Sequence, residues 1–187
     1  PEERQAIVDY IRTNNLKPMH LVATHGHFDH NFGNDTIYKE FGLKPEIHRK
    51  DERLLQTIGD QAMTIVGANI DAEMPAAGRL LSENDTIEFA HAAADLIGSH
   101  KFVVIETPGH SPGGVFYYCK EENVAFSGDT LFKGSIGRTD FVGGSMFMLI
   151  QSLRMISQMP DEVKLLPGHG PETSIGEEVA HNPYIDR

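Results

Sequence analysis

The chain has 187 residues, of which 40% are hydrophobic, and its formal net charge is −11 at pH 7. This length is enough for one substantial core, so we expect a single domain over residues 1–187. The negative charge disfavours nucleic acids and anionic membrane surfaces as partners. No apolar run approaches the roughly 20 residues of a membrane span. With no signal-peptide pattern recognised, we expect a soluble, cytoplasmic protein.

The first expected elements are a helix over residues 2–14 and a strand over 19–24. Pro1, followed by acidic residues, favours a helix start. Ile7, Val8 and Ile11 then give that helix an apolar stripe.

The expected strand leads into Thr-His25-Gly-His27-Phe-Asp29-His30, which holds three imidazoles and one carboxylate within six consecutive residues. Side chains two apart in an extended segment face the same way, so His25 and His27 can share one cation. Asp29 and His30, past the next bend, can reach a second cation. A polar loop that is merely rich in histidine is the alternative, but such a loop has no need for four ligand-type side chains. The segment therefore predicts a metal site.

Alternating helix and strand patterns follow and indicate a mixed α/β fold. We expect a short helix near 34–41, a strand near 45–49 and a helix near 51–66. An apolar stripe marks the core-facing side of that last helix: Leu54, Leu55, Ile58, Ala62 and Ile65. Residues 67–85 are expected to form a long surface connection, with a flap over the site as the alternative.

Strands are expected near 86–91, 101–106, 114–119 and 123–127. Three apolar runs then end in Gly-containing turns that carry His110, Asp129 and His169. A strand fixes the direction from which such a side chain approaches, and the turn leaves it projecting at the rim of the sheet. Beside the first cluster, these three residues are candidate metal ligands.

The remaining features are expected to be structural. Cys119 lies in an apolar run and is expected to be a buried thiol, which leaves only nitrogen and oxygen donors for the metals. Ser145 is expected to cap a helix that extends to about 158. Its core stripe is Met146, Leu149, Ile150, Leu153 and Ile156. Histidines outside the motifs are expected to be structural or solvated: His20, His48, His91, His100 and His181.

These motifs resemble those of the metallo-β-lactamase-fold hydrolase superfamily, and within it the short, single-domain glyoxalase II-like hydrolases. The resemblance covers most of the chain and rests on four segments: residues 25–30, the Pro-Gly-His110 turn, residues 128–140 and residues 167–173. It implies a four-layer αβ/βα sandwich with two metals at one edge of its two sheets.

The resemblance also implies the ligand sets. One metal is held by His25, His27 and His110, a second by Asp29, His30 and His169, and Asp129 bridges both. Imidazole and carboxylate donors suit zinc first, and iron or manganese as well. The family carries N-terminal strands before the expected first helix, and these strands are apparently lacking in the chain as given. Exposed strand edges would then favour a homodimer or strand exchange.

The activity implied is hydrolysis by a metal-bridging hydroxide. Two cations about 3.5–4 Å apart acidify the water between them, and Asp29 is placed to orient it. A thiolate leaves without a dedicated acid because thiols are comparatively acidic. A thioester such as S-D-lactoylglutathione, a small molecule, is therefore the expected substrate. Arg138 corresponds to a basic substrate-binding position, with a salt bridge to Asp140 as the alternative role.

Three other readings stay in view. One is a mononuclear iron persulfide dioxygenase, a relative that shares the segment from Gly137 to Phe141. Another is a metal-binding member without turnover. A β-lactamase is disfavoured because Asp129 stands where zinc β-lactamases often carry cysteine. Glutathione itself is not required, since a lactone or another small thioester fits the same chemistry.

Overall fold

The computed structural model describes residues 2–69, 73–89 and 100–185. Its helices are α1 (Glu2–Thr13), α2 (Phe28–Asn31), α3 (Asn34–Phe41), α4 (Glu52–Gln56), α5 (Ile58–Val66), α6 (Met146–Ile156) and α7 (Ile175–His181), with the 3-10 turn η1 at Arg49–Asp51. The strands are β1 (Leu21–Val22), β2 (Pro45–His48), β3 (Arg79–Leu81), β4 (Thr86–Phe89), β5 (His100–Glu106), β6 (Val115–Cys119), β7 (Val124–Gly128), β8 (Leu131–Phe132), β9 (Ser135–Ile136), β10 (Lys164–Pro167) and β11 (Thr173–Ser174).

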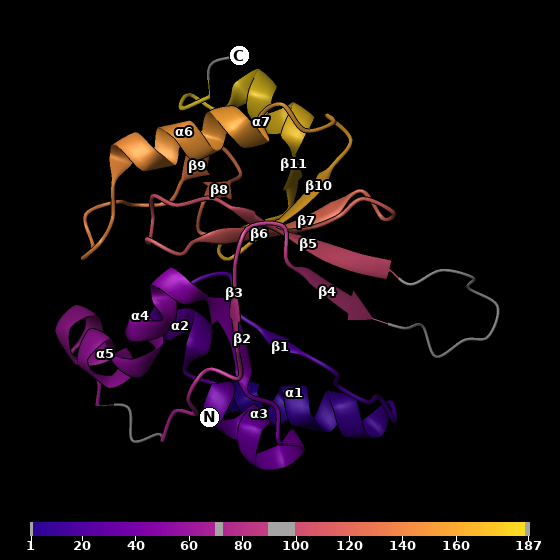
Figure 1. Cartoon of the computed structure of the whole chain (residues 1–187), viewed down its shortest axis with the longest axis vertical. Coiled ribbons are helices and arrows are strands. Elements are labelled where there is room, and N and C mark those ends of the chain that lie inside the picture. The colour runs from indigo at the N-terminus through magenta and orange to yellow at the C-terminus, as the bar shows by residue number, and fades with distance from the viewer. Residues whose placement is uncertain (1, 70–72, 90–99, 186–187) are drawn as a thin grey trace.

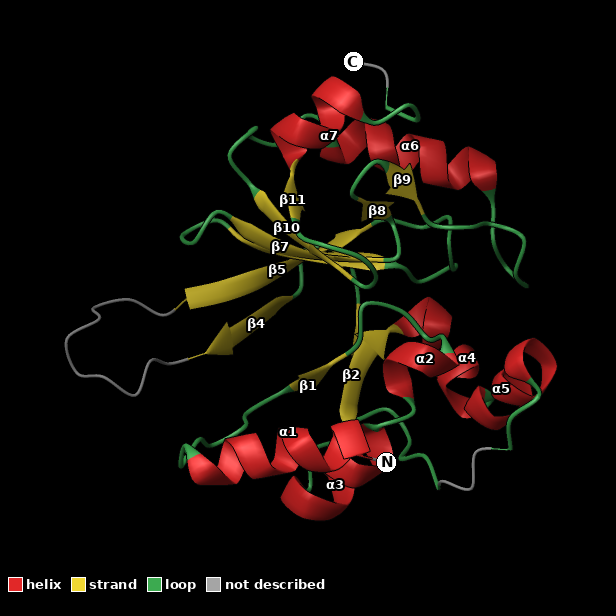
Figure 2. Ribbon diagram, turned by 180° about the vertical axis from the view of Figure 1, so that it is seen from behind, coloured by secondary structure: helices red, strands yellow, loops and turns green. Residues whose placement is uncertain are grey.

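Two sheets form the centre of the molecule. The smaller is parallel with the order β1-β2-β3, and the larger has the order β11-β10-β7-β6-β5-β4. Helices α1 and α3 lie outside the smaller sheet, and α6 and α7 lie outside the larger one (Figures 1 and 2). The expected αβ/βα layering is confirmed, because each sheet buries one face on helices and the other towards its partner sheet.

Buried aliphatic side chains join these layers. Leu81 of the smaller sheet packs with Val104 and Tyr117 of the larger one, so this cluster lies between the sheets. A second cluster includes Phe116, Leu165 and buried residues of α6, which fixes that helix on the outer face. The hydroxyl of Tyr117 also donates to the carbonyl oxygen of Ala23, 2.8 Å away, and so ties the larger sheet to the segment after β1.

Several expected elements are confirmed, and five details differ. Residues 67–85 were expected to be a surface connection, but residues 79–81 form strand β3, which pairs with β2. Ile7, expected in the apolar stripe of the first helix, is 54% exposed.

The helix expected over 51–66 is broken at Thr57. The hydroxyl of Thr57 donates to the carbonyl of Leu54 and so competes with the backbone bonds that would continue the helix. Ile65 was expected in the core but is 39% exposed, because it faces a cavity. Met146, also expected in the core, is 48% exposed, since only later turns of α6 reach the buried cluster.

Other expectations hold in the described residues. Ser145 caps α6, with its hydroxyl accepting from the backbone N–H of Met148, and Cys119 is buried. Of the histidines outside the motifs, His20 pairs with Glu46 and His48 with Glu106, whereas His91 lies outside the described residues. None of the helices in the described part of the chain has the length and apolar character that crossing a bilayer requires.

Candidate metal centre

The first four candidate ligands lie on the segment between β1 and α2. His25 lies in a bend after β1, His27 is the extended residue that precedes α2, and Asp29 and His30 are within that short helix. The amide of Asn31 donates to the carbonyl oxygens of His25 and His27, both at 2.8 Å. These two bonds hold the turn, so its four side chains point into one region.

The other three candidates meet this segment at one edge of the larger sheet. Strands β5 and β7 both run antiparallel to β6, and β10 runs parallel to β7. The carboxyl ends of β5, β7 and β10 therefore share an edge, and the turns that follow them carry His110, Asp129 and His169. This common direction explains why residues distant in the sequence converge.

His25, His27 and His110 form one group whose donor atoms all lie within 4.8 Å of one another. The Nδ1 of His27 is 2.8 Å from the Nε2 of His110. His110 also has its Nδ1 2.7 Å from the carbonyl oxygen of Arg138. Because a carbonyl can only accept, that Nδ1 carries a proton, and the Nε2 of His110 faces the group.

Asp29, His30 and His169 form a second such group. The Nε2 of His169 lies 3.2 Å from the Nε2 of His30 and 3.2 Å from the Oδ2 of Asp29.

Asp129 stands between the two groups. Its Oδ1 is 3.3 Å from the Nε2 of His30, and its Oδ2 is 3.5 Å from the Nε2 of both His110 and His169. The structure thus brings together all seven residues that the sequence nominated.

Two buried atoms show that this cluster is incomplete without a cation. The Nε2 of His25 and the Oδ1 of Asp129 are buried and make no hydrogen bond within the described residues. Buried polar atoms in native proteins are almost always satisfied. Both atoms lie among nitrogen and oxygen atoms that can act as metal ligands. A cation bound among those atoms would give both of them a partner.

The protonation states fit the same reading. Burial lowers the pKa of His25 well below its ordinary value, and burial followed by the charge of His110 lowers the pKa of His27 to about 4. Burial alone would raise the pKa of Asp129, but its contact with His30 and the nearby imidazoles outweigh burial and lower it. Burial alone would lower the pKa of His30, but its hydrogen bond to Asp129 and the charges of Asp129 and Asp29 outweigh burial and raise it. The neutral imidazoles of His25 and His27 and the charged carboxylate of Asp129 are the forms that bind a divalent cation.

Asp51 supports the cluster without belonging to it. Its buried carboxylate accepts from the backbone N–H of Gly26 at 2.9 Å, from the hydroxyl of Ser111 at 2.6 Å and from the N–H of Gly113 at 2.6 Å. It therefore joins the first ligand segment to the His110 turn. The sequence did not reveal this role, because an acidic residue in the first turn of an expected helix is ordinary helix chemistry.

Arg138 lies at the open side of the site. Its guanidinium is paired with both carboxylate oxygens of Asp140 at 2.6 Å and lies 4.2 Å from the centre of the Phe141 ring. Arg138 also lines a cavity of about 460 Å³ together with Asp129 and His169. The expected salt bridge is present, and the same side chain faces the space beside the cluster.

Known proteins are similar to this chain in sequence and in fold. A sequence profile of the Metallo-beta-lactamase superfamily matches residues 1–169. Hydroxyacylglutathione hydrolase GloC of Haemophilus influenzae is 33% identical over 188 residues, covering 98% of this chain and 84% of that protein. The crystal structure of BLEG-1 B3 metallo-beta-lactamase is 36% identical with a TM-score of 0.84, covering 97% of this chain and 83% of that one. The structure of TTHA1623 in a di-iron-bound form is 33% identical with a TM-score of 0.84, covering 97% and 84%.

Proposed function

The chain belongs to the metallo-beta-lactamase superfamily, and from this premise we propose that it is a binuclear metal-dependent hydrolase that cleaves thioesters. The observation that carries the proposal is the convergence of seven ligand-type side chains, together with two buried atoms among them that make no hydrogen bond within the described residues, the Nε2 of His25 and the Oδ1 of Asp129.

The proposed ligands follow the two groups. His25, His27 and His110, whose donor atoms lie together, would hold one divalent cation. The second cation is held by Asp29, His30 and His169, and Asp129 serves both. Zinc is the first candidate, and iron or manganese suits the same donors. The di-iron form of TTHA1623 supports iron as a serious alternative.

When bound, such cations supply an acidified water molecule and polarise a substrate carbonyl. The chain's own residues then set the geometry. Asp29, exposed at the edge of the cluster, can accept a hydrogen bond from that water and so orient it. Arg138 faces the same cavity and offers a guanidinium to a carboxylate of the substrate.

A thioester suits this site because the chain needs no acid to protonate the departing thiolate. The name of the Haemophilus influenzae relative adds support, since a hydroxyacylglutathione hydrolase acts on a glutathione thioester. S-D-lactoylglutathione is therefore the first substrate to test.

The test compares the zinc-loaded wild-type protein with His27→Ala and with His181→Ala, which changes an exposed histidine on α7. We expect S-D-lactoylglutathione hydrolysis by the wild type and by His181→Ala, and its loss in His27→Ala. Bound metal without turnover of any thioester or lactone would instead identify a binding protein.

Two further arms separate the remaining enzymes. Oxygen consumption with glutathione persulfide by the iron-loaded protein would indicate a dioxygenase, the activity associated with the segment from Gly137 to Phe141. Cleavage of a β-lactam in preference to thioesters would indicate a lactamase, an arm that the similarity to BLEG-1 justifies.

A further inference from the structure

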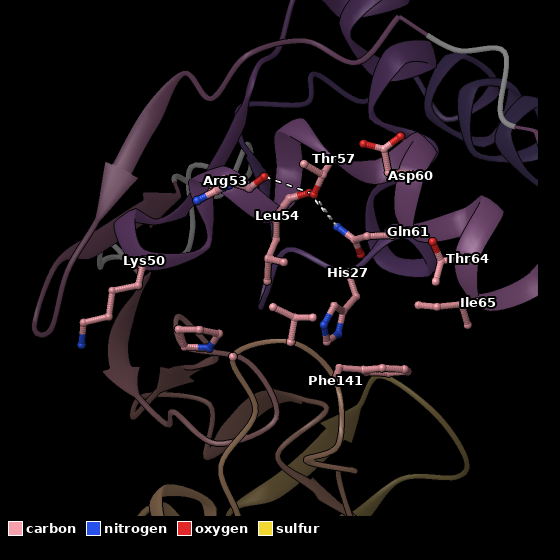
Figure 3. Close-up of a pocket in the computed structure, with 13 residues that line it drawn as sticks. His27, Lys50, Arg53, Leu54, Thr57, Asp60, Gln61, Thr64, Ile65 and Phe141 are labelled. Atoms are coloured by element: carbon pink, nitrogen blue, oxygen red, sulfur yellow. Dashed lines mark hydrogen bonds between the residues drawn. The ribbon is translucent and has the colours of Figure 1, made fainter.

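A second cavity of about 540 Å³ adjoins the candidate metal centre. It lies between helices α4 and α5 on one side and the loop of Phe141 on the other, and we name it the α4–α5 cavity (Figure 3). His27, Ile65 and Phe141 line both this cavity and the one that contains Asp129 and His169. A ligand at the metal centre could therefore extend past these three residues into the α4–α5 cavity.

Part of the wall of the α4–α5 cavity is apolar. It includes Leu54, Ile65, Pro112 and Phe141. The amide of Gln61 is also in the wall, but its polar atoms are already used. Its Nε2 donates to the carbonyl of Leu54 at 2.7 Å, and its Oε1 accepts from the N–H of Phe28 at 3.2 Å. The amide thus offers a ligand little hydrogen-bonding capacity.

Two other polar residues of the wall make bonds within the protein, and two more carry opposite charges. The hydroxyl of Thr57 donates to a backbone carbonyl of α4, 3.1 Å away. The ammonium of Lys50 is 3.0 Å from the Oε2 of Glu106, and its side chain extends to one side of the cavity in Figure 3. Arg53 and Asp60 contribute one charge of each sign. The cavity therefore favours a carbon chain over an ion.

Phe141 lies where the two cavities meet. Its ring centre lies 5.2 Å from that of His27, and the guanidinium of Arg138 stacks on it at 4.2 Å. Arg138 and Ser135 line the cavity that contains Asp129 but do not line the α4–α5 cavity. On that side, Arg138 offers a positive charge to an anionic thiol portion of the substrate. On the other side, the α4–α5 cavity offers apolar side chains to an apolar group.

We propose that the α4–α5 cavity binds the acyl group of the substrate, and that this acyl group is an extended apolar chain. The inference rests on the proposed hydrolase function and names its substrate class. The cavity falls in the range of roughly 300–1,000 Å³ that is usual for small-molecule sites, and it exceeds what a lactoyl group requires. Each added methylene should improve recognition about fourfold, the equivalent of ~0.8 kcal/mol.

The first test measures binding and needs no turnover. S-ethylglutathione and S-hexylglutathione are titrated into the zinc-loaded protein by calorimetry, because a thioether carries the chain where the thioester carries its acyl group. We expect affinity to rise about fourfold for each methylene. Thr64→Trp, which fills the cavity from an exposed position on α5, should reduce the ratio of the two affinities at least tenfold. Met63→Trp, a neighbouring exposed change outside the cavity lining, should leave that ratio unchanged.

The second test measures kcat/KM for acetyl-, butanoyl- and hexanoylglutathione with the same three proteins. We expect a rise with chain length in the wild type and in Met63→Trp, and a flattened profile in Thr64→Trp. Hydrolysis with no chain-length dependence, and an affinity ratio near one, would overturn the acyl site and leave the hydrolase intact. Chain-length-dependent binding without hydrolysis of any thioester would overturn the proposed function and leave the site intact.

Discussion

Asp51 illustrates how a residue outside the candidate ligand set can determine the geometry of that set. One carboxylate accepts three short hydrogen bonds from two separate segments, and both segments carry histidines of the same group. Bonds to a charged acceptor are roughly twice as strong as neutral ones. The position of His110 relative to His25 therefore depends in part on this buried carboxylate.

Replacing this carboxylate tests that dependence. In Asp51→Asn, the new NH₂ group must face at least one donor that it cannot satisfy, so we expect a loss of roughly 2–3 kcal/mol in the free energy of unfolding. Zinc affinity should fall roughly 10–100-fold, as for other residues that orient metal ligands. Urea denaturation and a competitive zinc titration measure the two effects, with Glu73→Gln, an exposed loop change, as the control. Wild-type values for both quantities would show that Asp51 does not organise the site.

The lack of a side chain at Gly168 lets its backbone lie close to two candidate ligands, Asp129 and His30. A Cβ at this position would lie 2.2 Å from the Oδ1 of Asp129 and 2.5 Å from the Cε1 of His30. Gly168→Ala should therefore displace these two side chains and weaken binding of the cation assigned to Asp29, His30 and His169 by roughly 10–100-fold.

Gly59→Ala is the matched control for that change, since nothing lies within 4 Å of a Cβ built on Gly59 in α5. This control should raise stability by roughly 0.5–1 kcal/mol through helix propensity and leave metal binding unchanged. Two equally tight zinc ions in Gly168→Ala would contradict the assignment of the second group.

At the level of the elements, the site depends on contact between the two sheets. The candidate ligands come from the end of β1 on one side and from the ends of β5, β7 and β10 on the other. The backbone N–H of Val115 donates to the carbonyl of Thr24 at 2.9 Å, and the hydroxyl of Tyr117 donates to that of Ala23. These bonds fix the first ligand segment on the larger sheet.

Removing one of these bonds should loosen the contact. Tyr117→Phe leaves the buried carbonyl of Ala23 without this donor, and we expect a loss of roughly 1–3 kcal/mol in the free energy of unfolding. Tyr118→Phe removes the same atom from the next residue, which faces the other side of β6 and is only half-buried, so its effect should stay below about 0.5 kcal/mol. Equal effects of the two variants in urea denaturation would refute the role of the Tyr117 hydroxyl.

The sequence could predict those elements in which apolar side chains recur at a clear helical or strand spacing. The apolar stripe of α6 and the strands β5 to β7 were recognisable because one face of each is largely buried. The stripe expected for α1 is only partly so, because Val8 is buried but Ile7 is 54% exposed. The break at Thr57 was not recognisable, because it depends on a hydroxyl that bonds to the preceding turn. The seven candidate ligands were recognisable because rare side-chain types follow strand ends directly. Asp51 and the α4–α5 cavity were not, because both arise from segments that meet only in the folded chain.

At the scale of the whole molecule, metal binding and folding should be coupled. The two groups of candidate ligands gather residues from position 25 to position 169, and this arrangement cannot persist in an unfolded chain. Cations that bind only the folded state stabilise it by mass action, by about 2.7 kcal/mol at a concentration one hundred times the dissociation constant.

We therefore expect chelation to lower the melting temperature, and zinc to restore it in proportion to the logarithm of its free concentration. Differential scanning calorimetry measures the shift, with calcium as a control ion because it prefers sites built from oxygen ligands alone. An unchanged melting temperature across the zinc titration would exclude coupling of this kind.

The account as a whole requires that two ions bind where the seven side chains meet. The most direct measurement is the number of metal ions per chain, determined by elemental analysis after zinc loading and removal of unbound metal. We predict two ions in the wild-type protein. One ion or none at saturation would contradict the binuclear centre, and with it the proposed route to thioester hydrolysis.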